Sequence, residues 1–194
     1  MKVNPIAIYQ TFIENLNIYA QGDQKHLDEI QNYTLSRLSK KQIGFEDLSP
    51  LLLINYCLNG IKDFKDFSYL VIDEAQDLSL AQYYVLKKLF PKARFNVFGD
   101  VNQSIYDYQS IHDWNELNNV IFNNKASMLE LNKSYRTTVN ISDASNLVLN
   151  HLGQNNSECV AREGDEIVIN NDITEASLIS QLKSLLDKEY QTIA

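Results

Sequence analysis

The chain has 194 residues, of which 44% are hydrophobic and 22% are charged, and its formal net charge is −8. This composition is typical of globular proteins and excludes fibrous and intrinsically disordered classes. The acidic balance gives no general attraction to phosphate backbones, so any nucleic-acid contact must be local or supplied by other parts of the protein. Long apolar runs and a secretory signal are absent from the sequence, so we expect a cytoplasmic protein without a membrane span. Cys57 and Cys159 match no metal-ligand spacing and are expected to be reduced thiols, with a disulfide as the alternative.

Residues 1–62 are expected to be helical, because apolar positions recur at intervals of three and four and β-branched runs are scarce. Asn4 can cap the first helix, Pro5 suits its first turn, and Gly22 is expected to end it. Two more helices are expected at about 24–40 and 45–59, the latter ending at Gly60. This segment carries no chemical motif, so we expect a scaffold or a partner surface.

After Gly60 the pattern changes to short apolar strands that alternate with helices. Strands are expected at 69–73, 95–98, 127–131 and 166–169, with a last strand beginning at TIA (192–194). Helices are expected at about 79–90, with Ser79 as its cap, at 140–152 and at 175–188. The alternation predicts an α/β fold with a parallel sheet covered on both faces, in which ligands bind beyond the carboxyl ends of the strands.

The stretch YLVIDEAQDLS places Asp73 and Glu74 at such a strand end. In nucleotide hydrolysis one carboxylate can hold a hydrated Mg²⁺ ion and the next can polarise the attacking water. Alone the pair is a weak signal, since acidic residues commonly end strands at solvent-facing turns. Two further stretches fit the same site: GDVNQSIY offers Gln103 after the next strand, and LNKSYRTT offers the planar guanidinium of Arg136 after the following one.

The stretches VIDEAQD, GDVNQSIY and LNKSYR, in this order and at this spacing, resemble helicase motifs II, III and IV of superfamily 1, of the UvrD/Rep/PcrA type. The phrases FEDLSPLLLINYCLNG and YYVLKKLFPKARFNVFGD are similar to the HelD-like branch, which includes DNA helicase IV-like proteins and motors that release stalled RNA polymerase. The resemblance implies a RecA-like parallel sheet of the P-loop NTPase fold, preceded by helices. It implies a helical segment at 1–62, the later part of a first RecA-like domain at 63–125, and the start of a second at 126–194.

The resemblance also implies ATP and Mg²⁺ as cofactors and gives roles to the motif residues. Asp73 would be the carboxylate of the magnesium site, and Glu74, beside it, the base that activates water. Gln103 would sense the terminal phosphate, and Arg136 would be the arginine finger. Tyr135 would stack near the adenine.

The segment after Gln103 is expected to contact nucleic acid. Tyr106 and Tyr108 fall where members of the family place aromatic residues that face single-stranded DNA, although Gln109-Ser110 replaces the usual Arg-Gly. In the acidic turn itself, Gln76 and Asp77 are expected to tie the turn to neighbouring loops.

The sequence lacks a G-x-x-x-x-G-K-[ST] phosphate loop, because none of its six glycines precedes a lysine. We therefore interpret the chain as a piece of a longer helicase and expect the piece alone to be inactive. The implied function is ATP-driven 3′ to 5′ movement on single-stranded DNA with duplex unwinding. The alternatives are a HelD-type motor that acts on RNA polymerase, with the amino-terminal helices on that partner, and a non-hydrolysing binding module.

Overall fold

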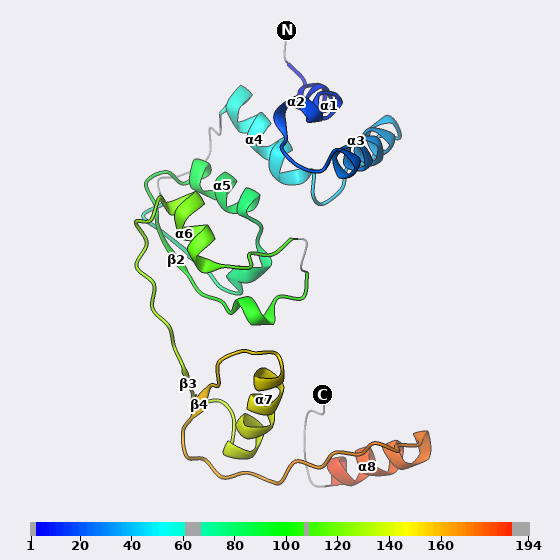
Figure 1. The fold of residues 1–194 in the computed structure, drawn as a ribbon, viewed down its shortest axis with the longest axis vertical. Helices are drawn as coiled ribbons and strands as arrows, with labels where there is room; N and C mark the ends of the chain where they lie inside the picture. Colours follow the sequence, from blue (N-terminus) through cyan, green and yellow to red (C-terminus); the bar gives the residue numbers. More distant parts are fainter. Residues whose placement is uncertain (1–2, 61–66, 107–108, 188–194) are drawn as a thin grey trace. The chain divides into compact units, whose positions relative to one another are not determined.

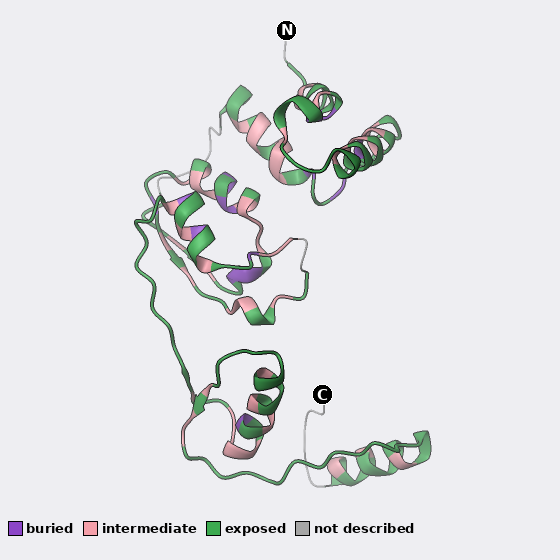
Figure 2. Cartoon of the chain, in the orientation of Figure 1, coloured by how far each residue is buried: buried purple, intermediate pink, exposed green. Residues whose placement is uncertain are grey.

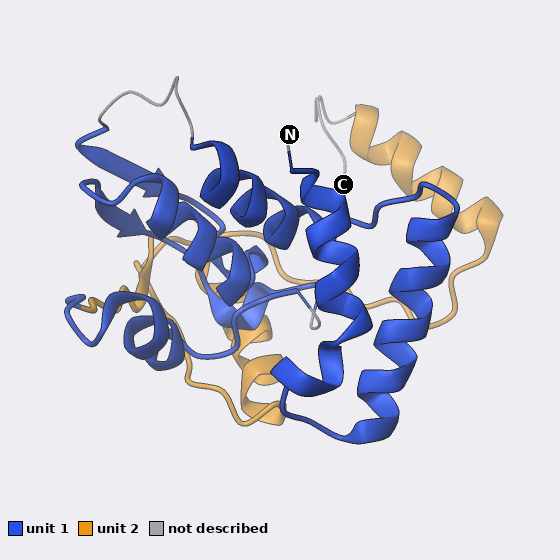
Figure 3. Cartoon of the chain, turned by 90° about the horizontal axis from the view of Figure 1, so that it is seen from above, with its two compact units in different colours: residues 1–127 blue, residues 128–194 orange. Residues whose placement is uncertain are grey.

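The computed structural model describes residues 3–60, 67–106 and 109–187 (Figure 1). The chain divides into two compact units, residues 1–127 and 128–194 (Figure 3). Each unit contains a two-stranded parallel sheet together with helices, and this combination fits the expected α/β class. The larger RecA-like sheet and the three-part domain division stay predictions. Within the described ranges, no helix is long and apolar enough to cross a membrane.

The first unit begins with four helices: α1 (Pro5–Glu14), α2 (Leu16–Tyr19), α3 (Gln24–Ser39) and α4 (Leu48–Asn59). Asn4 caps α1 as predicted, since its Oδ1 accepts a hydrogen bond from the Ile6 N–H at 3.0 Å. The expectation that one helix continues to Gly22 was wrong. Asn15 leaves the helical conformation at φ −114° and ψ 22°, and its Nδ2 donates to the Thr11 carbonyl. α4 ends at Gly60 as predicted, where φ is +64°.

A buried carboxylate joins α1 to the start of α4. Asp47 is 2% exposed; its Oδ1 accepts from the Tyr9 hydroxyl at 2.6 Å and its Oδ2 from the Gly44 N–H at 2.7 Å. Because Asp47 closes a turn with Gly44, α4 begins at Leu48 and not at the predicted residue 45. Burial of a carboxylate is tolerated here because donors approach both of its oxygens.

The rest of the first unit surrounds a short parallel sheet. β1 (Tyr69–Ile72) pairs with β2 (Arg94–Val97) in register from Tyr69↔Arg94 to Ile72↔Val97. The crossover helix α5 (Leu80–Leu89) begins after Ser79, as predicted, and α6 (Trp114–Phe122) was not predicted. Buried residues lie on α5, on α6 and in the turn after β1 (Figure 2), and α5 packs against α6. This core consists of Ala75, Tyr83, Ile111, Leu117 and Ile121.

The second unit is less buried. β3 (Lys133–Ser134) pairs in parallel with β4 (Glu158–Cys159), and helices α7 (Val139–His151) and α8 (Glu175–Asp187) lie close to their predicted positions. The strands predicted at 127–131 and 166–169 were wrong: neither stretch is a strand, and neither pairs with another strand among the described residues. Leu129 is 87% exposed and Ile169 is 79% exposed. The strand predicted from residue 192 lies outside the described residues. Cys57 and Cys159 are free thiols, as expected.

Candidate functional site

The acidic turn, residues 73–77, follows β1 directly. Asp73 and Glu74 are both exposed, and Asp73 Oδ1 accepts a hydrogen bond from the Glu74 N–H at 3.0 Å. Glu74 has a left-handed backbone, with φ 47° and ψ 42°, and residues 75–77 form a single turn of 3₁₀ helix, η1 (Ala75–Asp77). The chain therefore reverses immediately beyond the sheet. Both carboxylates lie at the carboxyl end of β1, where a parallel sheet presents its ligands.

Gln76 is the buried member of this turn, with only 2% of its surface exposed. Its Nε2 donates to Glu74 Oε2 at 2.8 Å, and its Oε1 accepts from the Asp100 N–H at 3.1 Å. Its backbone carbonyl accepts from the Ile111 N–H at 3.1 Å. The prediction that Gln76 ties the acidic turn to neighbouring loops is confirmed, whereas the same role for Asp77 stays a prediction.

The loop after β2, residues 98–106, packs directly against the acidic turn. The Ala75 N–H donates to the Phe98 carbonyl at 2.9 Å, and the Phe98 N–H donates to the Ile72 carbonyl at 2.8 Å. A Cβ at Gly99 would meet the Gln76 amide oxygen and lie 2.9 Å from the Ala75 nitrogen. Such contacts are too close for any side chain, so glycine at this position allows the two backbones to approach.

Gln103 is held within the same loop by Asp100. Asp100 Oδ2 accepts from Gln103 Nε2 at 2.9 Å, and its Oδ1 accepts from the Asn102 N–H at 3.0 Å, capping the short helix η2 (Val101–Gln103). The structure thus brings Asp73, Glu74 and Gln103 onto adjoining turns at the ends of β1 and β2. The hydrogen bond between Gln103 and Asp100 was not predicted from the sequence, although the position of Asp100 in a turn, three residues before Gln103, was an available signal.

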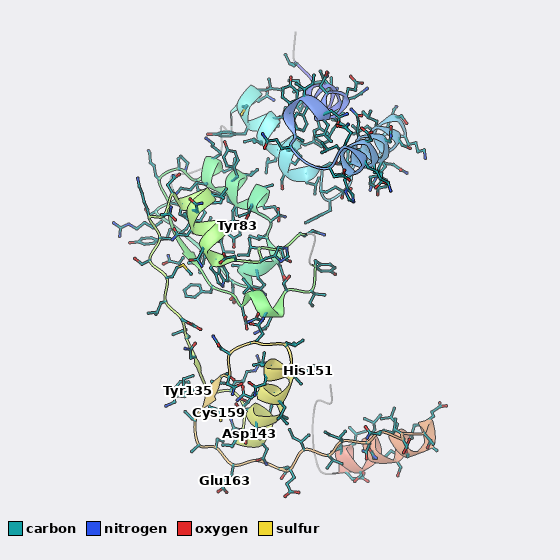
Figure 4. All side chains as sticks on the ribbon, in the orientation of Figure 1. Tyr83, Tyr135, Asp143, His151, Cys159 and Glu163 are labelled. Atoms are coloured by element: carbon teal, nitrogen blue, oxygen red, sulfur yellow. The ribbon has the colours of Figure 1, made fainter. Side chains whose placement is uncertain are left out.

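The acidic turn rests on α5 through Tyr83. This side chain is fully buried, and its hydroxyl donates to the Ala75 carbonyl at 2.7 Å; Figure 4 labels it inside the first unit. Burial raises the pKa of Tyr83, because the charged form would lose its hydration. A neutral hydroxyl therefore holds the backbone carbonyl of Ala75, the residue that follows the exposed Asp73 and Glu74.

The aromatic candidates have different environments. Tyr106 is 55% exposed, and its carbonyl accepts from the Gln109 N–H at 3.0 Å and from Ser110 Oγ at 2.6 Å. Tyr108 lies outside the described residues. Tyr106 is therefore an exposed residue at the end of the loop after β2.

Tyr135 and Arg136 belong to the second unit and follow β3. Tyr135 is 71% exposed, and Figure 4 labels it beside the β3 strand. Arg136 is exposed as well, and its backbone N–H donates to Ser134 Oγ at 3.4 Å. Both side chains are therefore accessible on their own unit.

The donor atoms at the acidic turn suit a magnesium ion bound together with nucleotide. Mg²⁺ usually takes one or two carboxylates and completes its shell with water and substrate phosphates. Asp73 and Glu74 supply such oxygens, and no cluster of three or more His, Cys, Asp or Glu side chains forms a closed metal cage in the part of the chain that the structure describes. These residues fit the metal side of a nucleotide site, whereas the sequence provides no phosphate loop for the triphosphate.

Comparison with known proteins places residues 10–118 within the UvrD/REP helicase N-terminal domain family. The chain is 33% identical over 133 residues to the ATP-dependent DNA helicase PcrA of Leuconostoc citreum, which covers 66% of the chain and 18% of that relative. It is 28% identical over 148 residues to PcrA of Bacillus subtilis (strain 168), covering 74% of the chain and 20% of the relative. DNA helicase II of Haemophilus influenzae is 28% identical over 145 residues, covering 69% and 20%. The chain thus spans about a fifth of the length of these curated relatives.

Proposed function

Because the chain belongs to the UvrD/REP helicase N-terminal domain family, we propose that it forms part of an ATP-dependent superfamily 1 DNA helicase. The observation that carries this proposal is the junction of the acidic turn with the loop after β2. Gln76 joins Glu74 to Asp100, and Asp100 in turn holds Gln103. A carboxylate pair and an amide on adjoining strand ends are the groups that a nucleotide hydrolase needs around its terminal phosphate.

In this proposal each residue that acts on nucleotide is exposed on its own unit. Asp73 would hold the hydrated metal, and the Glu74 carboxylate would take a proton from the attacking water. The amide of Gln103 would contact the terminal phosphate, and Arg136, on the second unit, is proposed as the arginine finger. Tyr135 stacks near the adenine. When bound, Mg²⁺ neutralises charge on the phosphate oxygens.

Movement along DNA would begin in the loop after β2. Gln103 and Tyr106 lie on this one segment, so a shift at the phosphate displaces a ring that stacks on a base. Tyr108 is proposed to act with Tyr106. By family resemblance, the movement on single-stranded DNA runs from 3′ to 5′.

A HelD-type motor that acts on RNA polymerase is the second candidate. The observation that favours it is the apolar surface of the amino-terminal helices, where Ile18 is 73% exposed and Tyr19 is 66% exposed. Such a surface suits a protein partner better than a nucleic acid. This candidate would be favoured if a longer chain that carries this sequence bound purified RNA polymerase and an Ile18→Asp substitution abolished the binding.

A phosphate-release assay tests the proposed hydrolysis. With ATP, Mg²⁺ and single-stranded DNA, residues 1–194 alone should release no measurable phosphate. A longer chain that carries this sequence and a phosphate loop should show DNA-stimulated turnover. Glu74→Gln should nearly abolish that turnover while nucleotide binding persists, because it removes the base and keeps the shape.

Two outcomes would contradict this proposal. Turnover by residues 1–194 alone, lost in Glu74→Gln, would show that no separate phosphate loop is required. Parental turnover in the longer Glu74→Gln chain would remove Glu74 from the reaction and favour a non-hydrolysing binding module.

A further inference from the structure

We propose that Gln76 is a positioning residue that couples the Glu74 carboxylate to Gln103 through Asp100. The hydrogen bonds run from Glu74 Oε2 to Gln76 Nε2 at 2.8 Å, from Gln76 Oε1 to the Asp100 N–H at 3.1 Å, and from Asp100 Oδ2 to Gln103 Nε2 at 2.9 Å. This inference rests on the proposed function and adds to it a link between the base and the phosphate-sensing amide.

The burial of Gln76 shows that this link is specific. A buried amide is costly unless both of its ends have partners, and at 2% exposure Gln76 has little access to water. An apolar side chain of similar size would fill the same space without that requirement. One partner of the amide, Glu74, is itself proposed to act on nucleotide. The other, Asp100, holds Gln103, which is proposed to contact the terminal phosphate.

The backbone around Gln76 limits how the link can move. Gly99 has no side chain, which lets the Gln76 amide reach the Asp100 N–H. The Ala75 N–H donates to the Phe98 carbonyl, and the Ile111 N–H donates to the Gln76 carbonyl. The two turns are therefore fastened by backbone bonds on both sides of the amide. A shift of Gln103 at the phosphate must be transmitted to Glu74 or break a hydrogen bond.

Two substitutions separate the two ends of the amide. Gln76→Met keeps the volume of the side chain and removes both side-chain hydrogen bonds. Gln76→Glu keeps an acceptor for the Asp100 N–H but cannot donate to Glu74, and it places a like charge beside that carboxylate. Gln82→Met is the matched control, because Gln82 also uses its side chain within this unit, where its Oε1 accepts from the Ser79 N–H at 2.7 Å.

Amide hydrogen exchange of residues 1–194, followed by NMR, tests the link without any activity. In Gln76→Met the Asp100 N–H should exchange about tenfold faster, the scale expected for one lost hydrogen bond. The Ile111 N–H should change by less than about twofold, because its acceptor is the Gln76 backbone. In Gln76→Glu and Gln82→Met, the Asp100 N–H should keep its protection. Unchanged exchange of the Asp100 N–H in Gln76→Met would overturn the link. If Gln76→Met fails to fold, loss of protection of the Asp100 N–H in Gln76→Glu would overturn it instead.

Kinetics of the longer chain test what the link does. Gln76→Met and Gln76→Glu should lower kcat by about tenfold to a hundredfold, the range for a small misplacement of reacting groups. KM for ATP should stay within about twofold, and Gln82→Met should match the parent. If Glu74→Gln abolishes turnover while both Gln76 variants keep the parental kcat, the coupling fails and the proposed function stands. If Glu74→Gln itself turns over normally, the proposed function fails first.

Discussion

At the scale of single residues, Glu74 has the most unusual backbone in the candidate site. A left-handed conformation costs a non-glycine residue about 1 to 2 kcal/mol, and Glu74 adopts it at φ 47°. The cost is offset locally, because the Glu74 N–H donates to Asp73 Oδ1 and its carboxylate accepts from Gln76. The backbone of Glu74 is therefore held by the same groups that place its carboxylate.

Tyr83→Phe should destabilise the first unit by about 1 kcal/mol near pH 7, because the Ala75 carbonyl loses the Tyr83 hydroxyl as a donor. Urea unfolding followed by fluorescence of Trp114 measures this, since Trp114 is the single tryptophan and packs against the core of this unit. Tyr84→Phe is the control, because Tyr84 is 44% exposed. Equal losses in the two variants would assign the effect to something other than this hydrogen bond.

Without any substitution, the first unit should also lose stability at alkaline pH. Burial raises the pKa of Tyr83 in the folded state, whereas an unfolded tyrosine loses its proton near about pH 10. The contribution of Tyr83 to the free energy of unfolding is thus fully present below about pH 10. It is lost as the pH rises from there toward the raised pKa of Tyr83 in the folded state. Tyr9 shares this behaviour through burial and its bond to Asp47. Tyr83→Phe should therefore reduce the alkaline loss without removing it, and an unchanged slope above about pH 10 would contradict this account.

At the scale of elements, the start of α5, the helix that carries Tyr83, is stabilised by a cap. Ser79 and Gln82 form a reciprocal capping box: Ser79 Oγ accepts from the Gln82 N–H at 3.3 Å, and the Gln82 side chain accepts from the Ser79 N–H at 2.7 Å. The cap satisfies donors that the first helical turn leaves without partners. It therefore stabilises the first turn of the helix that carries Tyr83.

Ser79→Ala should lower the free energy of unfolding of the first unit by about 1 kcal/mol, the usual cost of losing an N-cap. Ser79→Asp should recover most of this loss, because its carboxylate also accepts from the helical N–H groups. Denaturant unfolding monitored at Trp114 is the measurement. Ser36→Ala, at an exposed position within α3, should have little effect; a loss as large as that of Ser79→Ala would mean that the cap contributes nothing specific.

At the scale of the whole molecule, the residues that we propose to act on nucleotide are distributed over both units. Asp73, Glu74 and Gln103 belong to residues 1–127, whereas Tyr135 and Arg136 belong to residues 128–194. Each group is exposed on its own unit. A change in the second unit should therefore affect catalysis without affecting the stability of the first.

In the longer chain, Arg136→Ala should lower kcat by about a thousandfold or more, the scale for an arginine finger in related nucleotide hydrolases. The unfolding transition of the first unit, followed at Trp114, should not move. Arg162→Ala supplies the control, because Arg162 is an exposed arginine of the same unit. Turnover of Arg136→Ala within a few-fold of the parent would show that motif IV is misassigned.

Local sequence signals predicted the features that depend on neighbouring residues. The caps at Asn4 and Ser79 and the helix end at Gly60 follow from side chains and backbone freedom within a few positions. The order of the acidic stretch and GDVNQSIY likewise predicted that Glu74 and Gln103 would follow strands that pair in parallel. The caps and the helix end depend on residues within a few positions, and the pairing joins two strands that follow one another along the chain, so the sequence was sufficient to predict them.

Tertiary packing decided the features that depend on distant residues. The apolar stretches at 127–131 and 166–169 suggested strands, yet a strand requires a partner for its backbone groups, and Lys133–Ser134 pairs with Glu158–Cys159 instead. The burial of Gln76 and its hydrogen-bond partners could not be predicted from neighbouring residues either. Its burial and its bonds to Asp100 and Ile111 exist only once the loop after β2 folds against the acidic turn. The sequence determined the order of the chemical groups, and the packing of the two turns determined which of them are joined, because hydrogen bonds form between atoms that the fold brings within reach.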